Sequence, residues 1–414
     1  MTIFGIIWIC TLIFCFFSKK EYMIALAIVS SILQCDNVFD FGGFAVGPQI
    51  ITSSALIIKM LLHSDFKLKI HRNGYLIQVT LLALGFVVLI SSGFNNTLNG
   101  ILLRIVQLCI YILCVFSMRQ MGYEVEEDLI YSLIRKVTIF ALVIGVVQFL
   151  MTSSVLPRIG VISQLLYNEH SKNVYFYSDN YYRVTSTFME PSYFAAFIVG
   201  AFYYFLAINE KRKENRILLI AILAEIIMSF SSSAYGAFVI AGILFFACSR
   251  EGKLKIALVA TAVIGFGIMY FAFYNVLDSV IFSKMASNSG VGRYYLNQEA
   301  IRNFQASPII GNGYKTSRAS SLLYTLLAEI GVVGLGLYLW VNIQIVLPSI
   351  FQKKNRRMPS HYVGLSIAVI SAVIVQLIAV PDLDNCSYWM WMNLLFLYLS
   401  SNKEDRNSNE ESII

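Results

Sequence analysis

Long apolar segments alternate with short polar ones along almost the whole chain. A helix needs ~20 residues, at 1.5 Å each, to cross a bilayer. These segments are too long for barrel strands, and backbone groups in hydrocarbon must be hydrogen-bonded within the protein, so we expect helices. We place the spans at residues 2–17, 22–35, 44–62, 75–92, 98–117, 137–156, 191–208, 216–231, 234–249, 256–275, 321–347, 361–379 and 386–400. The pattern predicts one all-α domain over residues 1–414, a polytopic transmembrane bundle of about 11–13 spans.

The composition supports this fold class. Apolar residues make up 57% of the chain and charged residues only 13%, against about 25% charged residues in soluble domains. The segment 117–136 is polar at both ends, and we expect it to be an amphipathic helix on the cytoplasmic membrane surface. The seven cysteines show no metal-binding or redox spacing, although Cys35 and Cys386 are both placed near the outer surface, where a bridge is conceivable.

The basic residues give the orientation. If the loop after the first span is cytoplasmic, twenty-one of the thirty-one Lys and Arg residues fall in inner segments and eight in outer ones. Cytoplasmic loops collect basic residues, which predicts an external amino terminus and a cytoplasmic tail at 401–414. The net charge of +7 is then explained by topology, and no nucleic-acid partner is implied.

All eight outer cations lie in two segments, outer loop A at 157–190 and outer loop B at 276–320. The other outer segments, 36–43, 93–97 and 380–385, carry none, and the first and last of these are acidic. Two loops that oppose the usual charge bias suggest a shared anionic ligand.

In loop B, the sequence YYLNQEAIRNF predicts a short helix with Arg293 at its entrance, where free N–H groups favour a phosphate. Arg302 is nine residues further on and half a turn out of phase, so a straight helix cannot point both into one pocket. Arg302 either binds the ligand or pairs with Glu299. Arg318 either snorkels to the interface or uses its planar fork to hold a phosphate.

Loop A offers groups suited to a sugar. Tyr181 and Tyr182 precede Arg183, and their rings would either anchor the protein at the interface or stack on sugar rings. Glu190 precedes Pro191 at the start of a span, where it either complements the helix dipole or accepts a proton from a sugar hydroxyl. His170 is the only histidine placed outside and is a second candidate base. No outer cluster of metal ligands is evident, so neither a metal nor a cofactor is expected.

Arg104 lies about six residues inside a predicted span, at a depth of ~9 Å by helical rise. An arginine at that depth is a candidate site residue. It either snorkels outward or pairs with Glu225 of another span.

Two stretches resemble a known family. GVGRYYLNQEAIRNFQASPIIGNGYK, followed by LLYTLLAEIGVVGLGLY, resembles the late outer loop and next span of Wzy-type polysaccharide polymerases and the related O-antigen ligases. RVTSTFMEPSYFAAF is similar to an earlier loop of the same family, and Arg302 and Gly313 fit its spacing of an Arg, ten residues and a Gly. The resemblance covers roughly residues 180–340. The Ser-Arg pair expected in the middle hairpin is replaced by SSSAYG.

The resemblance implies a GT-C-like membrane glycosyltransferase without a metal. It would join undecaprenyl-diphosphate-linked oligosaccharides into O-antigen or capsular polysaccharide on the outer face of the bacterial inner membrane, within membrane lipid and alongside a chain-length regulator and a flippase. Arg293 and Glu190 would be catalytic. The substrate would be held by Arg183, Arg302, Arg318, Arg104, Tyr181 and Tyr182. An O-antigen ligase is the alternative, although Ser320 stands where ligases place a histidine. A lipid-linked sugar flippase or solute transporter is the alternative from another class.

Overall fold

The computed structural model describes residues 3–35, 37–41, 44–63, 74–95, 98–122, 125–152, 176–178, 181–208, 215–248, 288–351 and 358–401. The fold is an all-α bundle, as the sequence predicts. Its helices are α1 (Ile3–Phe17), α2 (Lys20–Ser30), α3 (Pro48–His63), α4 (Tyr75–Phe94), α5 (Leu98–Met121), α6 (Glu127–Thr152), α8 (Pro191–Ile208), α9 (Asn215–Met228), α10 (Ser232–Cys248), α13 (Asn288–Ala306), α14 (Leu322–Ile350), α15 (Ser360–Ile378) and α16 (Cys386–Ser401).

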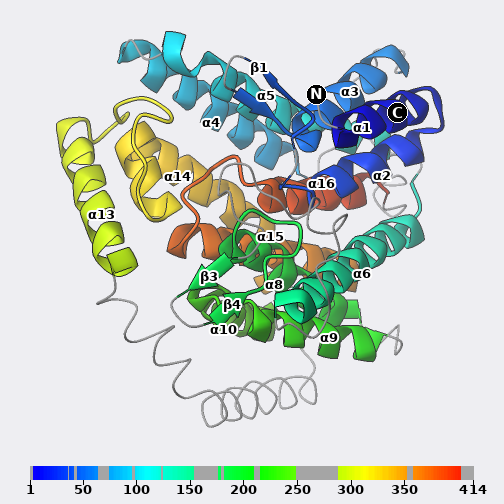
Figure 1. The fold of residues 1–414 in the computed structure, drawn as a ribbon. Coiled ribbons are helices and arrows are strands. Elements are labelled where there is room, and N and C mark those ends of the chain that lie inside the picture. Colours follow the sequence, from blue (N-terminus) through cyan, green and yellow to red (C-terminus); the bar gives the residue numbers. More distant parts are fainter. Residues whose placement is uncertain are drawn as a thin grey trace.

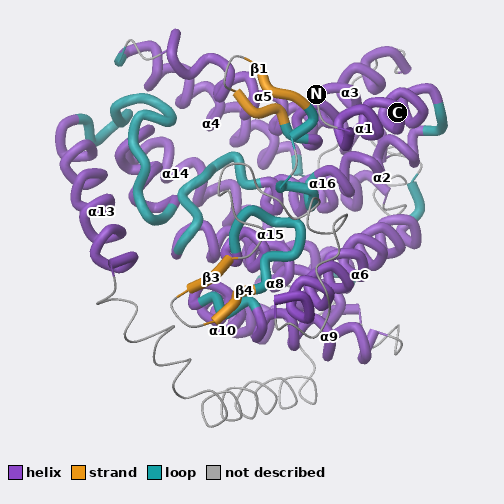
Figure 2. The backbone as a smooth tube through the Cα atoms, viewed as in Figure 1, coloured by secondary structure: helices purple, strands orange, loops and turns teal. Residues whose placement is uncertain are grey.

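Two short antiparallel hairpins are added to the helices (Figure 2). In the first, β1 (Phe39–Phe41) pairs with β2 (Phe44–Val46), and Asp40 lies opposite Ala45. In the second, β3 (Phe176–Ser178) pairs with β4 (Tyr181–Arg183), and Tyr177 lies opposite Tyr182. The second hairpin lies in predicted loop A, so part of that loop is a strand pair.

Six of the described helices, α4, α5, α6, α8, α14 and α15, are long and apolar enough to cross a membrane, and α1, α3 and α10 are shorter apolar helices. Every predicted span within the described residues is a helix, while the span predicted at 256–275 and the tail at 401–414 lie outside them, apart from Ser401. The protein is therefore a polytopic membrane protein.

The centre of the bundle is formed by α8, α15 and α16 (Figure 1). Nearly every side chain of these helices is buried, including Trp389 and Trp391. A helix that is apolar all round is typical of a bundle centre. On the outside, α4 exposes large apolar side chains such as Leu76 and Phe86, as expected of a surface in contact with lipid.

The prediction of a separate surface helix over 117–136 is wrong. The first part of that segment is the end of α5, and the last part is the beginning of α6, which continues to Thr152. The buried positions of α6 follow a helical spacing from Ile130 through Ile134 and Val137 to Met151, so one apolar face joins the polar start to the span. Cys35 and Cys386 are not joined by a disulfide.

Candidate functional site

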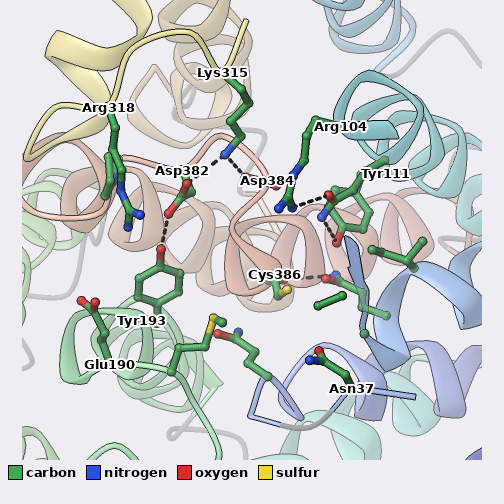
Figure 3. A pocket seen from close by; sticks show the side chains of 18 of the residues that line it. Asn37, Arg104, Tyr111, Glu190, Tyr193, Lys315, Arg318, Asp382, Asp384 and Cys386 are labelled. Carbon is green, nitrogen blue, oxygen red and sulfur yellow. Dashed lines mark hydrogen bonds and ion pairs between the residues drawn. The ribbon is translucent and has the colours of Figure 1, made fainter. Parts of the chain in front are cut away.

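A cavity of about 800 Å³ lies at one end of the bundle. Three helices begin at its wall, namely α3, α8 and α16, and the N-terminal halves of α5 and α14 complete it. The end of α2 and the residues after it also contribute, and the rest of the wall includes residues from segments predicted to be external, among them Asn37, Glu190, Lys315 and Asp382 (Figure 3). Because helix N-termini carry partial positive charge, this end of the bundle is suited to an anion.

The wall of the cavity combines both signs of charge. Its described cations are Arg104, Lys315 and Arg318, and its described carboxylates are Glu190, Glu329, Asp382 and Asp384. The sequence predicted cations with one acidic residue, Glu190, and the structure adds Glu329, Asp382 and Asp384 to the wall.

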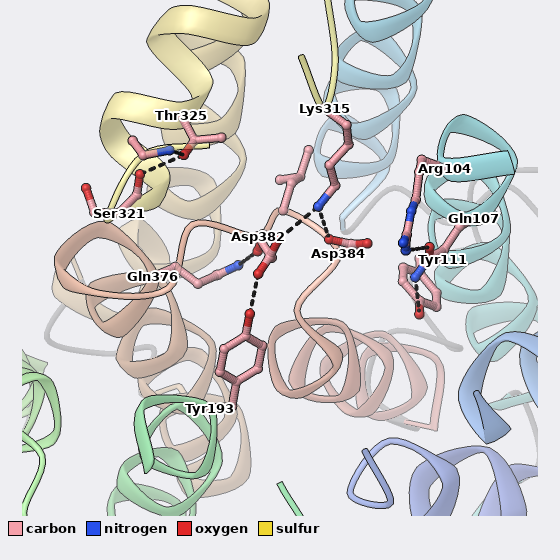
Figure 4. A network of polar contacts seen from close by, with 12 residues as sticks. Arg104, Gln107, Tyr111, Tyr193, Lys315, Ser321, Thr325, Gln376, Asp382 and Asp384 are labelled. Carbon is pink, nitrogen blue, oxygen red and sulfur yellow. Dashed lines mark hydrogen bonds and ion pairs between the residues drawn. The ribbon is translucent and has the colours of Figure 1, made fainter. Parts of the chain in front are cut away.

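A network of polar contacts centres on Lys315 (Figure 4). Its Nζ lies 2.9 Å from Asp382 Oδ1 and 2.8 Å from Asp384 Oδ1. The other carboxylate oxygen of Asp382 accepts a hydrogen bond from the Tyr193 hydroxyl at the start of α8. A run of hydrogen bonds fixes the backbone here, since Tyr338 of α14 donates to Gln376 of α15, which donates to the Asp382 carbonyl. Asp382 is therefore bound by the loop that carries Lys315, by α8 and by α15, and it is connected to α14 through Gln376.

Lys315 and Asp382 each stabilise the charged form of the other. Burial alone would lower the pKa of Lys315, but the neighbouring Asp384, Tyr314 and Asp382 groups raise it well above its ordinary value. Burial alone would raise the pKa of Asp382, but Lys315 and the Tyr193 hydrogen bond lower it. Lys315 and Asp382 are thus both ionised at neutral pH, and the formal charges of Lys315, Asp382 and Asp384 sum to −1.

The loop that carries Lys315 and Arg318 is held by a break in α14. Gly331 has a φ of 65°, and the helix is interrupted there. The carbonyls of Ala328 and Glu329, which lose their partners one turn on, accept instead from the N–H groups of Asn312 and Gly313 at 2.9 and 3.0 Å. In exchange, Val332 and Val333 donate to the Pro308 and Ile309 carbonyls at 2.9 and 3.3 Å.

This exchange of backbone hydrogen bonds explains the glycines of the Gly-x-Gly sequence at 311–313 and the Glu-x-Gly sequence at 329–331. A Cβ on Gly331 would lie 2.2 Å from the Ile309 carbonyl oxygen, and a Cβ on Gly311 would lie 2.2 Å from the Glu329 carbonyl carbon. Both glycines also have positive φ, which other residues adopt at a cost. The two motifs therefore form a single joint, and the next residues along the loop are those that enter the cavity.

Arg104 reaches the cavity from α5. Its Nη1 lies 3.3 Å from Gln107 Oε1, and Gln107 donates in turn to the Tyr111 hydroxyl at 3.0 Å. Arg104 points into the cavity in Figure 3. The suggested partner Glu225 lies elsewhere, with its carboxylate packed against Gly145 of α6, and does not line this cavity.

Glu190 and Arg318 also line the cavity. Glu190 precedes Pro191 at the start of α8, as predicted, and its carbonyl accepts the N–H groups of Tyr193 and Phe194. Its Oε2 accepts from the Ser192 hydroxyl at 3.3 Å. Arg318 has an exposed side chain and interacts electrostatically with Asp382.

Arg293 and Arg302 do not line the cavity. The helix that carries them, α13, begins at Asn288 rather than near Tyr294, so Arg293 lies in its second turn and not at its entrance. Asn297 of this helix accepts hydrogen bonds from Ser320, and Asn303 donates one to Ser317. The loop that carries these serines therefore lies between α13 and the cavity. Arg293 is partly exposed, and Arg302, on the opposite side, is exposed.

Arg183 is in β4 and lies outside the cavity wall, where its Nε donates to the Ser229 carbonyl at 3.3 Å. Tyr181 and Tyr182 are in the same strand, but their side chains lie outside the described part of the structure, as does His170. Much of predicted loop A, and loop B before residue 288, is outside it too.

Sequence reasoning assigned no site role to Tyr193, Glu329, Asp382 or Asp384, and it counted Lys315 only as one of the outer cations of loop B. The signal for the two aspartates was the sequence PDLDN between two spans, where an acidic turn faces the outer cations. Tyr193 is one aromatic residue among many in an apolar span and gave no separate signal.

The chain matches no model of a known protein family, and a search of curated proteins found no significant match. The function has to be inferred from the chain's own residues.

Proposed function

We propose that this protein is a polymerase that joins undecaprenyl-diphosphate-linked oligosaccharides into a surface polysaccharide, an O-antigen or a capsule. The observation that carries the proposal is the meeting of Arg104, Arg318 and Glu190 in one cavity at the end of the bundle where several helices begin. A diphosphate needs cations and N–H groups, and sugar hydroxyls need carboxylates. The cavity offers both within about 800 Å³.

In this proposal Arg104 and Arg318 bind the donor's diphosphate. As the acceptor hydroxyl attacks the anomeric carbon, the bond to the diphosphate breaks and negative charge develops on the leaving group. Fixed cations and helix N-termini directed at that position stabilise the transition state. Glu190, on the opposite wall in Figure 3, accepts a hydrogen bond from the acceptor hydroxyl. No cofactor enters the proposal.

The proposal places the cavity on the outer face of a bacterial inner membrane. Four segments predicted to be external contribute to its wall, 36–43, 157–190, 276–320 and 380–385. A carrier lipid in the outer leaflet would enter from the membrane, and the other partners would be a flippase and a chain-length regulator.

One observation favours a transporter, because interrupted helices are common in transporter binding sites. The break at Gly331 has this character. Its released backbone groups, however, bond to the loop at 308–313 and are not left for a ligand. For the ligase alternative, Ser320 stands at the expected histidine position and binds Asn297.

Deletion of the gene, followed by gel analysis of the host's polysaccharide, tests the proposal. We expect single repeats in place of long polymer. Free polymer that is not attached to its acceptor would indicate a ligase. Repeats trapped on the cytoplasmic leaflet would indicate a flippase.

A further inference from the structure

The carboxylate of Asp382 is the most firmly positioned acid in the cavity. One oxygen is held by Lys315 at 2.9 Å and the other by the Tyr193 hydroxyl. A carboxylate has about four acceptor positions, so about two remain for a substrate. The side chain is 21% exposed, and it faces the cavity beside Arg318.

The other carboxylates of the cavity are less suited to take a proton. Glu329 is 1% exposed within α14. The side chain of Asp384 is 10% exposed, about half as much as that of Asp382, and its Oδ1 lies 2.8 Å from Lys315 Nζ. Glu190, at the start of α8, has one oxygen bound to the Ser192 hydroxyl at 3.3 Å, a longer contact than the 2.9 Å between Lys315 and Asp382, so Glu190 is positioned less firmly.

We propose, on the basis of the polymerase function above, that Asp382 is the base that takes the proton from the attacking sugar hydroxyl, with Tyr193 and Lys315 as its positioning residues. Glu190 then orients the hydroxyl. The acceptor oxygen forms its bond to the anomeric carbon, and the carbon–oxygen bond to the diphosphate breaks with its electron pair on the diphosphate. The hydroxyl proton passes to an oxygen of Asp382 and is later lost to water.

The division of charge in the cavity supports this assignment. The Lys315 cluster has a net negative charge, which disfavours a diphosphate and suits a hydroxyl that is losing its proton. Arg318, which interacts electrostatically with Asp382, and Arg104 of α5 lie on either side of the cluster in Figure 3. In this arrangement the two arginines bind the diphosphate leaving group, and Asp382 takes the proton.

The test uses purified full-length protein in liposomes and the lipid-linked oligosaccharide that accumulates in the deletion strain. Asp382→Ala should lower turnover by about 10²–10⁴-fold while donor binding stays within a few fold of wild type. Added formate, a small carboxylate, should enter the vacated space and restore turnover at least tenfold. Asp384→Asn should lose less activity and should not respond to formate.

Turnover of Asp382→Ala within tenfold of wild type would overturn the assignment, as would recovery by formate in Glu190→Ala instead. A loss without formate recovery would assign Asp382 a structural role only. If Asp382→Ala does not fold, the nearly isosteric Asp382→Asn must show the same loss with intact donor binding. Failure of the wild-type protein to form polymer would refute the polymerase proposal itself, whereas active wild type with active Asp382→Asn refutes only this inference.

Discussion

The arginines show how much of the site can be predicted from residue types alone. Sequence reasoning identified a set of outer arginines, and the cavity contains two of the candidates, Arg104 and Arg318. Arg293 was favoured because a helix entrance attracts phosphate, but the helix begins five residues earlier. The sequence predicts the helix over YYLNQEAIRNF because glycines disfavour a helix, yet α13 includes Gly290 and Gly292.

Arg318→Ala should lower chain growth by about 10²-fold, because removing one preorganised group that stabilises charge in the transition state typically lowers turnover by about that factor. Arg302→Ala is the matched control, since Arg302 is an exposed arginine on α13 outside the cavity. It should stay within a few fold of wild type. Polymer length and membrane abundance of each variant are measured together. Equal losses of chain growth in the two variants would contradict a role for Arg318 in binding the leaving group.

At the scale of elements, the joint between α14 and the loop at 308–313 positions the cavity. The sequence showed the two glycine motifs but not their relationship, because the pairing joins residues that are apart in the chain and depends on one positive φ at Gly331. A hydropathy pattern does not report a helix break when the apolar residues continue through it. The presence of each described span was well predicted, since it depends only on local apolar length, but α6 begins ten residues before its predicted span and α2 ends five residues early.

Gly331→Ala should destabilise the protein, by about 1–3 kcal/mol for the backbone conformation and more for the clash with Ile309. Gly336→Ala is the control, because a Cβ at Gly336 would have no atom within 4 Å. Thermal unfolding in detergent compares the two. Equal melting temperatures would show that the break is not a fixed part of the fold.

Lys315→Met should also lower stability, by up to about 3 kcal/mol, because two carboxylates lose their cation. The pKa of Asp382 is lowered in the folded protein, so its stabilising contribution is present above about pH 4 and lost as pH falls through the folded value. The raised pKa of Lys315 keeps its contribution complete below about pH 10. The difference in melting temperature between wild type and variant should therefore stay large from pH 7 down to about pH 4 and narrow only at lower pH. A difference that widens on acidification would contradict this coupling.

At the scale of the whole molecule, the charge pattern and the three-dimensional arrangement agree. Segments predicted to be external from the distribution of Lys and Arg meet around one cavity, although they are far apart in the sequence. Periodicity and the charge bias could predict which helix ends share a face of the membrane. They could not predict that Tyr193, Lys315 and Asp382 would be in contact, because that depends on how the helices pack.

The topology can be tested with thiols introduced singly into a cysteine-free background. A thiol at Arg183 or Arg318 should react with an impermeant reagent added outside intact cells. A thiol at the exposed Glu127, in a segment predicted to be cytoplasmic, should react only after the cells are opened. The reverse pattern would place the cavity on the cytoplasmic side and remove its access to an outer-leaflet donor.

The most direct test of the polymerase proposal is turnover by the purified protein in liposomes that contain only a lipid-diphosphate-linked oligosaccharide. The protein should release lipid diphosphate and build a ladder of products that differ by one repeat, and Arg318→Ala should do so about 10²-fold more slowly. An unchanged substrate, with wild-type protein that is folded and fully incorporated, would contradict the account.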